Sequence, residues 1–69
     1  MENWLARARK RAGLSEEDAA RALRMSGAGY AHAERRPGTL TIDEIGALCR
    51  AMDKADARAM LEDLFETLA

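Results

Sequence analysis

Apolar residues recur along the chain at intervals of three and four positions, the spacing that lines up one face of an α-helix. The most regular stretch is C-terminal, where apolar residues stand at relative positions 0, 3, 4, 7, 8 and 11: Ala57, Met60, Leu61, Leu64, Phe65 and Leu68. Earlier stretches repeat the pattern in shorter form. The sequence therefore predicts five helices, over residues 3–11, 16–24, 27–35, 42–52 and 57–68.

Capping signals set the boundaries of these helices. Ser15 and Thr41 are each followed three residues later by a carboxylate, which is the pattern of a capping box. Ser26 and Asp56 are expected to cap the third and fifth helices, because short polar side chains accept hydrogen bonds from free backbone N–H groups. Residues 36–38, Arg-Pro-Gly, form the strongest break in the helical pattern.

Composition argues against a β-sheet. The 33 apolar residues include 15 alanines, two isoleucines and no valine, and three threonines bring the β-branched residues to only five. Strands favour β-branched side chains, so five are too few to furnish a sheet. We therefore expect an all-α fold, and a chain of 69 residues has room for a single domain over residues 1–69.

Charge is divided unevenly, although the whole chain carries a net charge of only −1. Residues 1–36 hold eight basic and five acidic side chains, a net charge of +3, whereas residues 37–69 hold three basic and seven acidic ones, a net charge of −4. The basic residues cluster at 7–11 and 35–36, so one face can be positive even though the molecule is not. The plainer alternative is that these charges belong to solvated helix faces.

The residue types that catalysis or metal binding would need are scarce. One cysteine, Cys49, and one histidine, His32, cannot form an internal disulfide or supply the ligands of an ordinary zinc site. Ser26 and His32 fall on different sides of the third predicted helix, so we predict no catalytic residues, no metal, no cofactor and no small-molecule ligand. No apolar run is long enough to span a membrane, and the expected location is the cytoplasm.

Residues 24–26 alone separate the second and third predicted helices. Helices joined by so short a segment must cross steeply, as in a helix-turn-helix unit, whose second helix can enter the major groove of DNA. From about residue 5 to residue 53 the chain also resembles the lambda-repressor-like, Xre/Cro family of DNA-binding domains. The matching residues are Leu5, Arg9, Gly13-Leu14-Ser15, Glu17, Ala20, Leu23, Met25-Ser26, Tyr30, Glu34, Thr41-Ile42, Leu48 and Ala51-Met52.

The resemblance implies a compact five-helix bundle that regulates transcription, usually as a dimer on duplex DNA. It places the DNA-facing surface on the third helix and on the residues directly before and after it, at Ser26, Gly27, Ala28, Ala31, His32, Arg35 and Arg36. His32 is either a donor to DNA or an ordinary exposed residue. Arg35 and Arg36 either hold phosphates or complement the C-terminus of their own helix.

The resemblance also implies that Arg9 and Glu34 form a buried salt bridge, which would tie the first helix to the end of the third. The arginine fork can hold a carboxylate through two hydrogen bonds at once, so such a pair would orient the third helix. The alternative is two unrelated exposed charges.

Several positions depart from the family. The family usually begins the second helix with glutamine, where this chain has Glu16, and has glycine in the turn, where this chain has Arg24. Its third helix usually begins with polar residues, whereas Gly27 and Ala28 offer no hydrogen bond to a base edge. Two functions follow: a small repressor-like DNA-binding regulator, or a degenerate module that pairs with another regulator protein, as an antirepressor does, with weak or no DNA binding.

The end of the last helix offers a surface for assembly. Phe65 and Leu68 continue the apolar stripe where so small a domain runs out of core, and Trp4 lies near the other terminus. Large apolar groups at a surface tend to mark an interface, so these three residues predict a homodimer. The alternative is that they close a small second core within one chain.

Overall fold

The computed structural model describes residues 2–69, and within that range it contains five α-helices, one short 3₁₀ turn and no strand. The elements in chain order are α1 (Trp4–Arg11), α2 (Glu16–Ala22), α3 (Gly27–Arg35), η1 (Pro37–Thr39), α4 (Ile42–Arg50) and α5 (Lys54–Leu68). The prediction of an all-α, five-helix fold is confirmed. Only the lengths differ, because α2 and α4 end two residues early and α5 begins three residues early.

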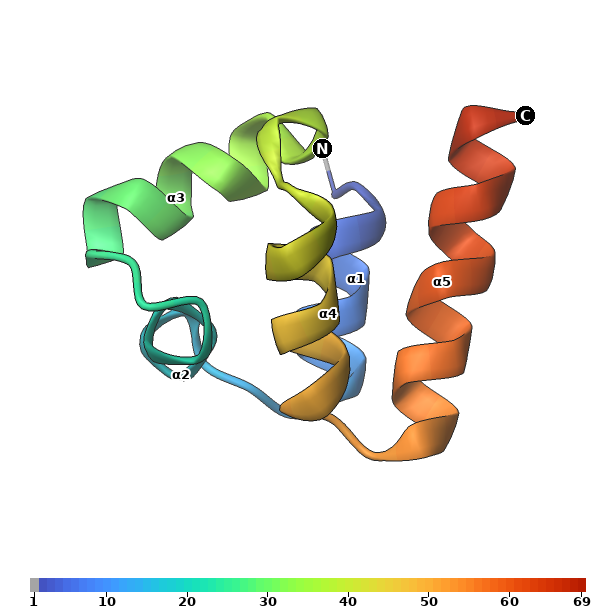
Figure 1. Cartoon of the computed structure of the whole chain (residues 1–69), viewed down its shortest axis with the longest axis horizontal. Helices are drawn as coiled ribbons and strands as arrows, with labels where there is room; N and C mark the ends of the chain where they lie inside the picture. The colour runs from blue at the N-terminus through green and yellow to red at the C-terminus, as the bar shows by residue number, and fades with distance from the viewer. Residues whose placement is uncertain (1) are drawn as a thin grey trace.

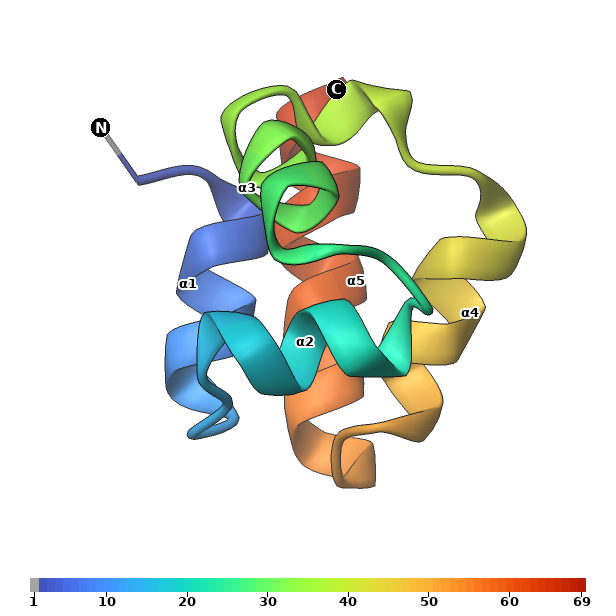
Figure 2. The same cartoon turned by 90° about the vertical axis from the view of Figure 1, so that its left-hand side faces the viewer.

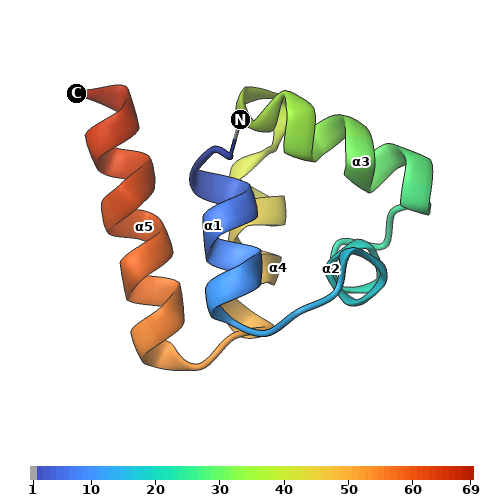
Figure 3. The same ribbon diagram turned by 180° about the vertical axis from the view of Figure 1, so that it is seen from behind.

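The helices form two groups that cross each other. α1, α4 and α5 run side by side, and α5 packs against both of the others (Figures 1 and 3). α2 packs against α3 and α4, and in Figure 1 it is seen end-on while α3 lies across the picture. The pair α2–α3 therefore crosses steeply, as the short connection between them predicts, and both helices face the viewer in Figure 2.

The core draws on every helix. Its largest fully buried side chains come from α1, α3, α4 and α5: Leu5, Tyr30, Leu48 and Met60. α2 contributes Ala19 and Ala20, whose small side chains let its backbone approach the other helices. Each large apolar side chain buried in this way contributes about 1.5–3 kcal/mol. The hydroxyl of Tyr30 finds no hydrogen-bond partner among the described residues, and burial raises its pKa, so this side chain stays neutral.

Hydrogen-bonding side chains begin the helices as the sequence predicts, with one exception. Ser15 and Thr41 form capping boxes at α2 and α4, and the hydroxyl of Ser26 accepts from a backbone N–H in the first turn of α3. The prediction that Asp56 caps the last helix is wrong. The cap is Asp53, whose carboxylate accepts from the backbone N–H of Asp56 at 2.8 Å, so the helix begins one turn earlier.

Two helices end in the same backbone motif. After α1, the N–H groups of Gly13 and Leu14 donate back to carbonyls of the last helical turn, and Gly13 has a left-handed φ of 75°. After α2, the N–H groups of Arg24 and Met25 make the equivalent two bonds, and Arg24 has a φ of 57°. These are Schellman motifs, which favour glycine at the left-handed position. The second one carries an arginine there.

The expected assembly surface is only partly exposed. Trp4 is 4% exposed and belongs to the core, because the first turn of α1 is covered where it meets η1, α4 and the end of α5. It is therefore not on the surface where we expected it. Phe65 and Leu68 are 74% and 76% exposed, so they close no second core within the chain.

Candidate nucleic-acid interface

One face of α3 is turned to solvent along its whole length. Tyr30 and Ala33 fix the opposite face in the core, which leaves the expected contact residues outward. Of these, Ala31 is half-buried and the others are exposed: Ser26, Gly27, Ala28, His32, Arg35 and Arg36. The structure thus brings the residues expected from the sequence onto one accessible helix and its two capping residues.

The two glycines of α3 differ in what they do for the structure. The Ser26 hydroxyl accepts from the N–H of Gly29 at 3.0 Å. A Cβ atom on Gly29 would stand 3.2 Å from that hydroxyl oxygen, so a side chain there would crowd the cap and the hydroxyl would have to shift slightly. A Cβ atom on Gly27 would meet nothing within 4 Å. No contact in the structure requires Gly27 to be glycine, and its small size is a property of the exposed surface alone.

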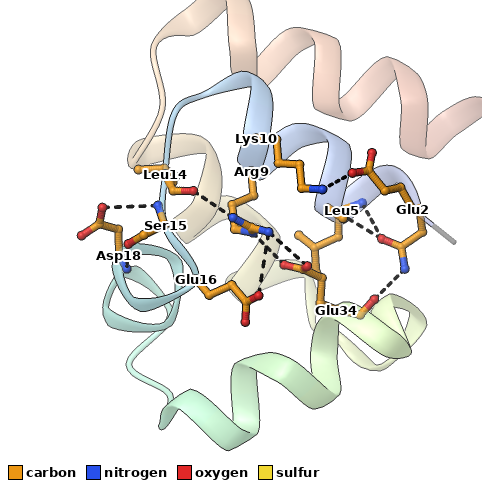
Figure 4. Close-up of polar contacts among 11 residues, drawn as sticks. Glu2, Leu5, Arg9, Lys10, Leu14, Ser15, Glu16, Asp18 and Glu34 are labelled. Atoms are coloured by element: carbon orange, nitrogen blue, oxygen red, sulfur yellow. Dashed lines mark hydrogen bonds and ion pairs between the residues drawn. The ribbon is translucent and has the colours of Figure 1, made fainter.

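A bidentate ion pair joins the end of α3 to α1. The Nε and Nη2 atoms of Arg9 donate to the two carboxylate oxygens of Glu34 at 2.8 and 3.3 Å, and Nη1 donates to the carbonyl of Leu14 at 3.1 Å (Figure 4). The side chains of Arg9 and Glu34 are only 12% and 17% exposed. Burial is the largest single influence and acts to raise the pKa of Glu34, but the hydrogen bonds and charge of Arg9, together with its other polar neighbours, hold that pKa below its usual value.

A second contact holds Glu34, at its main-chain carbonyl, and comes from Asn3. Asn3 accepts hydrogen bonds from the backbone N–H groups of Leu5 and Ala6, both at 3.1 Å, and so caps α1. Its side-chain amide also donates to the main-chain carbonyl of Glu34 at 2.6 Å. Sequence reasoning missed this contact. The only signal was an N-cap residue type before the first helix, which says nothing about a partner 31 residues away.

The acidic first turn of α2 lies near this junction, and its charges have cationic neighbours. Glu16 lies 4.0 Å from Arg9 (Figure 4), while Arg21 lies 3.7 Å from Glu17 and 3.2 Å from Asp18. The negative charge at the start of α2 is therefore partly balanced within the chain. Glu16 is the least compensated of the three, since its contact is the longest and is made to an arginine that already binds Glu34.

The positive charge at the C-terminal end of α3 has no such balancing partners among the described residues. Arg35 and Arg36 are exposed, and within residues 2–69 neither makes an ion pair. The segment after them is fixed, because the hydroxyl of Thr39 donates to the carbonyl of Arg36 at 2.8 Å. The end of α3 thus presents two free guanidinium groups on an ordered backbone.

A separate apolar region lies where η1 and α4 meet the end of α5. It is a groove of about 390 Å³, and its polar side chains are those of Asn3 and Thr67 only. Ile42, on its edge, is 82% exposed. Leu68 also lines the groove, and on α5 the exposed apolar face continues from it through Phe65 to Leu61, which is 44% exposed.

The described residues contain no candidate for two other kinds of site. No cluster of three or more His, Cys, Asp or Glu side chains in residues 2–69 is placed to hold a metal ion. Over the same range, no helix combines the length and the apolar character needed to cross a membrane.

Comparison with known proteins gives one match. A family model described as helix-turn-helix matches residues 5–56, about three quarters of the chain, from α1 to the first turn of α5. The match thus includes both helices of the steeply crossing pair and the exposed face of α3. No curated protein and no solved structure matches the chain.

Proposed function

The chain belongs to the lambda-repressor-like helix-turn-helix family, and from this premise we propose that it is a small DNA-binding regulator of transcription. In this proposal residues 1–69 act as one domain, and α3 enters the major groove of duplex DNA. The observation that carries the proposal is the end of an anchored helix, α3, where Arg35 and Arg36 are exposed and make no ion pair with any other residue that the structure describes.

Most of the binding free energy in this proposal comes from phosphates. Arg35 and Arg36 are placed to neutralise backbone phosphates, which position a protein on DNA without reading its sequence. Gly27, Ala28 and Ala31 supply no hydrogen bond to a base, although a methyl group can touch thymine. Besides Arg35, which this proposal places on a phosphate, His32 is an exposed side chain of α3 that could donate to a base edge. We therefore expect a modest preference among sequences.

The salt dependence of binding tests this proposal. Changing Arg35 and Arg36 together to alanine should weaken binding to random and selected duplexes alike. The slope of log K against log salt concentration should become shallower by about 1.8, since each phosphate contact contributes about 0.9. Fluorescence anisotropy with labelled duplexes across a salt series measures both quantities.

A matched control removes the same charge elsewhere. Arg50 ends α4 and Lys54 begins α5, and the corner between these helices lies at the end of the molecule away from α3 (Figure 1). Changing both to alanine should leave the salt slope unchanged. The DNA-binding proposal fails if the wild-type protein binds no duplex even at low salt, or if the two double variants behave alike.

We further propose that the protein binds DNA as a homodimer through α5. Three side chains of one face of that helix support this, because Leu61, Phe65 and Leu68 are exposed although they are large and apolar. A twofold axis through this face would cover the stripe of both copies at once, as self-complementary interfaces do. It would present two copies of α3 to half-sites about 34 Å apart, one turn of DNA.

Sedimentation at micromolar concentration tests the dimer. The wild-type protein should sediment as a dimer, and Phe65→Ser with Leu68→Ser should sediment as a folded monomer, because serine removes the apolar area that drives association. Circular dichroism of the variant checks that the helices persist. A wild-type monomer, or a dimer that survives both substitutions, would rule this interface out.

A second function is supported by the acidic start of α2 and by the lack of hydrogen-bonding side chains at Gly27 and Ala28, in the first turn of α3. Glu16 is largely exposed and would repel a phosphate, and Gly27 and Ala28 read no base. On this alternative the chain is a degenerate helix-turn-helix that pairs with another regulator protein. A folded wild-type protein that ignores all duplexes at low salt would favour it over DNA binding.

A further inference from the structure

Glu34 is held by α1 at two different atoms. Arg9 binds its carboxylate, and the side-chain amide of Asn3 donates to its main-chain carbonyl at 2.6 Å. Glu34 lies in the last turn of α3, where carbonyl groups have no partner within the helix. Asn3 thus supplies a hydrogen bond that the end of α3 cannot supply for itself, and it comes from another helix.

We propose that Asn3 is a positioning residue for the DNA-binding surface, because it fixes the last turn of α3 and with it Arg35 and Arg36. The inference rests on the proposed function for its consequence, but the contact itself can be tested without DNA. The two arginines directly follow Glu34 in the chain. If the carbonyl of Glu34 is released, their backbone loses one of the hydrogen bonds that fix its orientation and keeps those at Arg36. Each phosphate contact must then complete the ordering of that turn as it forms.

The choice of asparagine fits this role better than a role in capping alone. Serine, threonine and aspartate also cap helices, since each offers an oxygen to the free N–H groups. Only asparagine among these carries an N–H donor beside that oxygen. Here the oxygen serves α1 and the N–H serves α3, so a single side chain joins the start of one helix to the end of the other.

Nuclear magnetic resonance tests the contact directly. The chain contains one asparagine and no glutamine, so Asn3 gives the only side-chain amide signals in a ¹H–¹⁵N spectrum. One of its two protons should be shifted downfield and exchange slowly with water. Two sharp, rapidly exchanging signals at the positions of a free amide would overturn the proposal whatever the DNA measurements show.

Asn3→Ser tests the consequence for binding. Serine keeps the capping oxygen and the charge but is too short to reach the Glu34 carbonyl, so affinity for duplex DNA should fall roughly three- to ten-fold, the usual value of one neutral hydrogen bond. The matched control is Asp53→Asn at the cap of α5, which bonds only within its own helix and should not weaken binding. Thermal unfolding shows whether the two variants stay folded at the binding temperature.

The decisive measurement combines this change with loss of the arginines. When Arg35 and Arg36 are already alanine, Asn3→Ser should lower the affinity for duplex DNA by less than about two-fold. The effects of residues that act through one another are not additive. An equal loss in both backgrounds would show that Asn3 acts by general stability, and would overturn the proposal. If the wild-type protein binds no DNA, the proposed function fails, whereas the amide spectrum still decides whether Asn3 holds α3.

Discussion

Arg24, at the end of α2, has a left-handed backbone conformation that its own side chain disfavours. Gly13 and Arg24 occupy the same place in two Schellman motifs, with φ values of 75° and 57°. Glycine adopts this conformation freely, whereas the Cβ atom of any other residue clashes there with its own backbone. The chain therefore contains both the favoured and the disfavoured version of one turn.

Arg24→Gly should stabilise the protein by about 1 kcal/mol, because relief of the left-handed conformation exceeds the entropy that glycine adds to the unfolded chain. Arg24 is exposed and makes no ion pair in the described part of the chain, so removing its side chain should cost little stability. Urea denaturation followed by circular dichroism measures the difference.

Gly13→Ala is the opposite control. It places a Cβ atom at the other left-handed position, where there is open space, and so it tests conformation without a steric contact. We expect a loss of about 1 kcal/mol. Equal stability of the wild type and both variants would show that backbone conformation does not limit either turn.

At the scale of whole helices, α5 shows which boundaries a sequence can specify. Asp53 and Asp56 stand three residues apart, and either could cap the helix or stabilise its first turn through the helix dipole. The structure makes Asp53 the cap, with Asp56 as the donor of the capped N–H group. Lys54 and Ala55 lie outside the apolar stripe that begins at Ala57, so the stripe predicted a later start.

Asp53→Ala should therefore cost about 1 kcal/mol, the usual effect of losing an N-cap. Asp56→Ala should cost less, about 0.3–0.5 kcal/mol, since it removes a favourable charge near the helix N-terminus and no hydrogen bond of its side chain. Thermal and urea unfolding of both variants give the comparison. The reverse order of the two losses would return the cap to Asp56.

The helices and the face of α3 were predictable because they depend on local signals. Periodicity, serine and threonine caps and the Arg-Pro-Gly break act within a few residues, and they placed α1 to α4 nearly correctly. The fate of Trp4 depends instead on what covers the first turn of α1, namely segments more than 30 residues away. The Asn3 contact is of the same non-local kind, and for that reason neither could be predicted from the pattern.

For the molecule as a whole, two hydrogen-bonded ion pairs join α1 to α5 and to α3. Arg7 binds both oxygens of Asp63 in α5 at 2.8 Å, and Arg9 binds Glu34 in α3. These arginines hold the pKa values of Asp63 and Glu34 below their usual values. A carboxyl group whose pKa is lower in the folded state contributes stability above its unfolded pKa, and that stability is lost as pH falls through the folded pKa.

The free energy of unfolding should be level at neutral pH and fall as the solution is acidified below about pH 4.5, the unperturbed value for Glu34. Urea titrations at a series of pH values measure this profile. Glu34→Gln should lower stability at pH 7 and make the acid loss smaller, because the substituted residue no longer binds a proton. A profile equally steep in both proteins would assign the acid loss to other carboxyl groups.

The packing of α1 against α5 also bears on the order in which the chain can fold. No other pair of helices in the described structure is in such extensive contact, yet these are its first and last helices. On a ribosome, α1 is synthesised before the helix that covers it. Leu5 and Trp4 can therefore be buried only after Met60 and Leu64 have emerged. The crossing of α2 and α3 is local and can form earlier, whereas the bundle closes only when α5 leaves the exit tunnel.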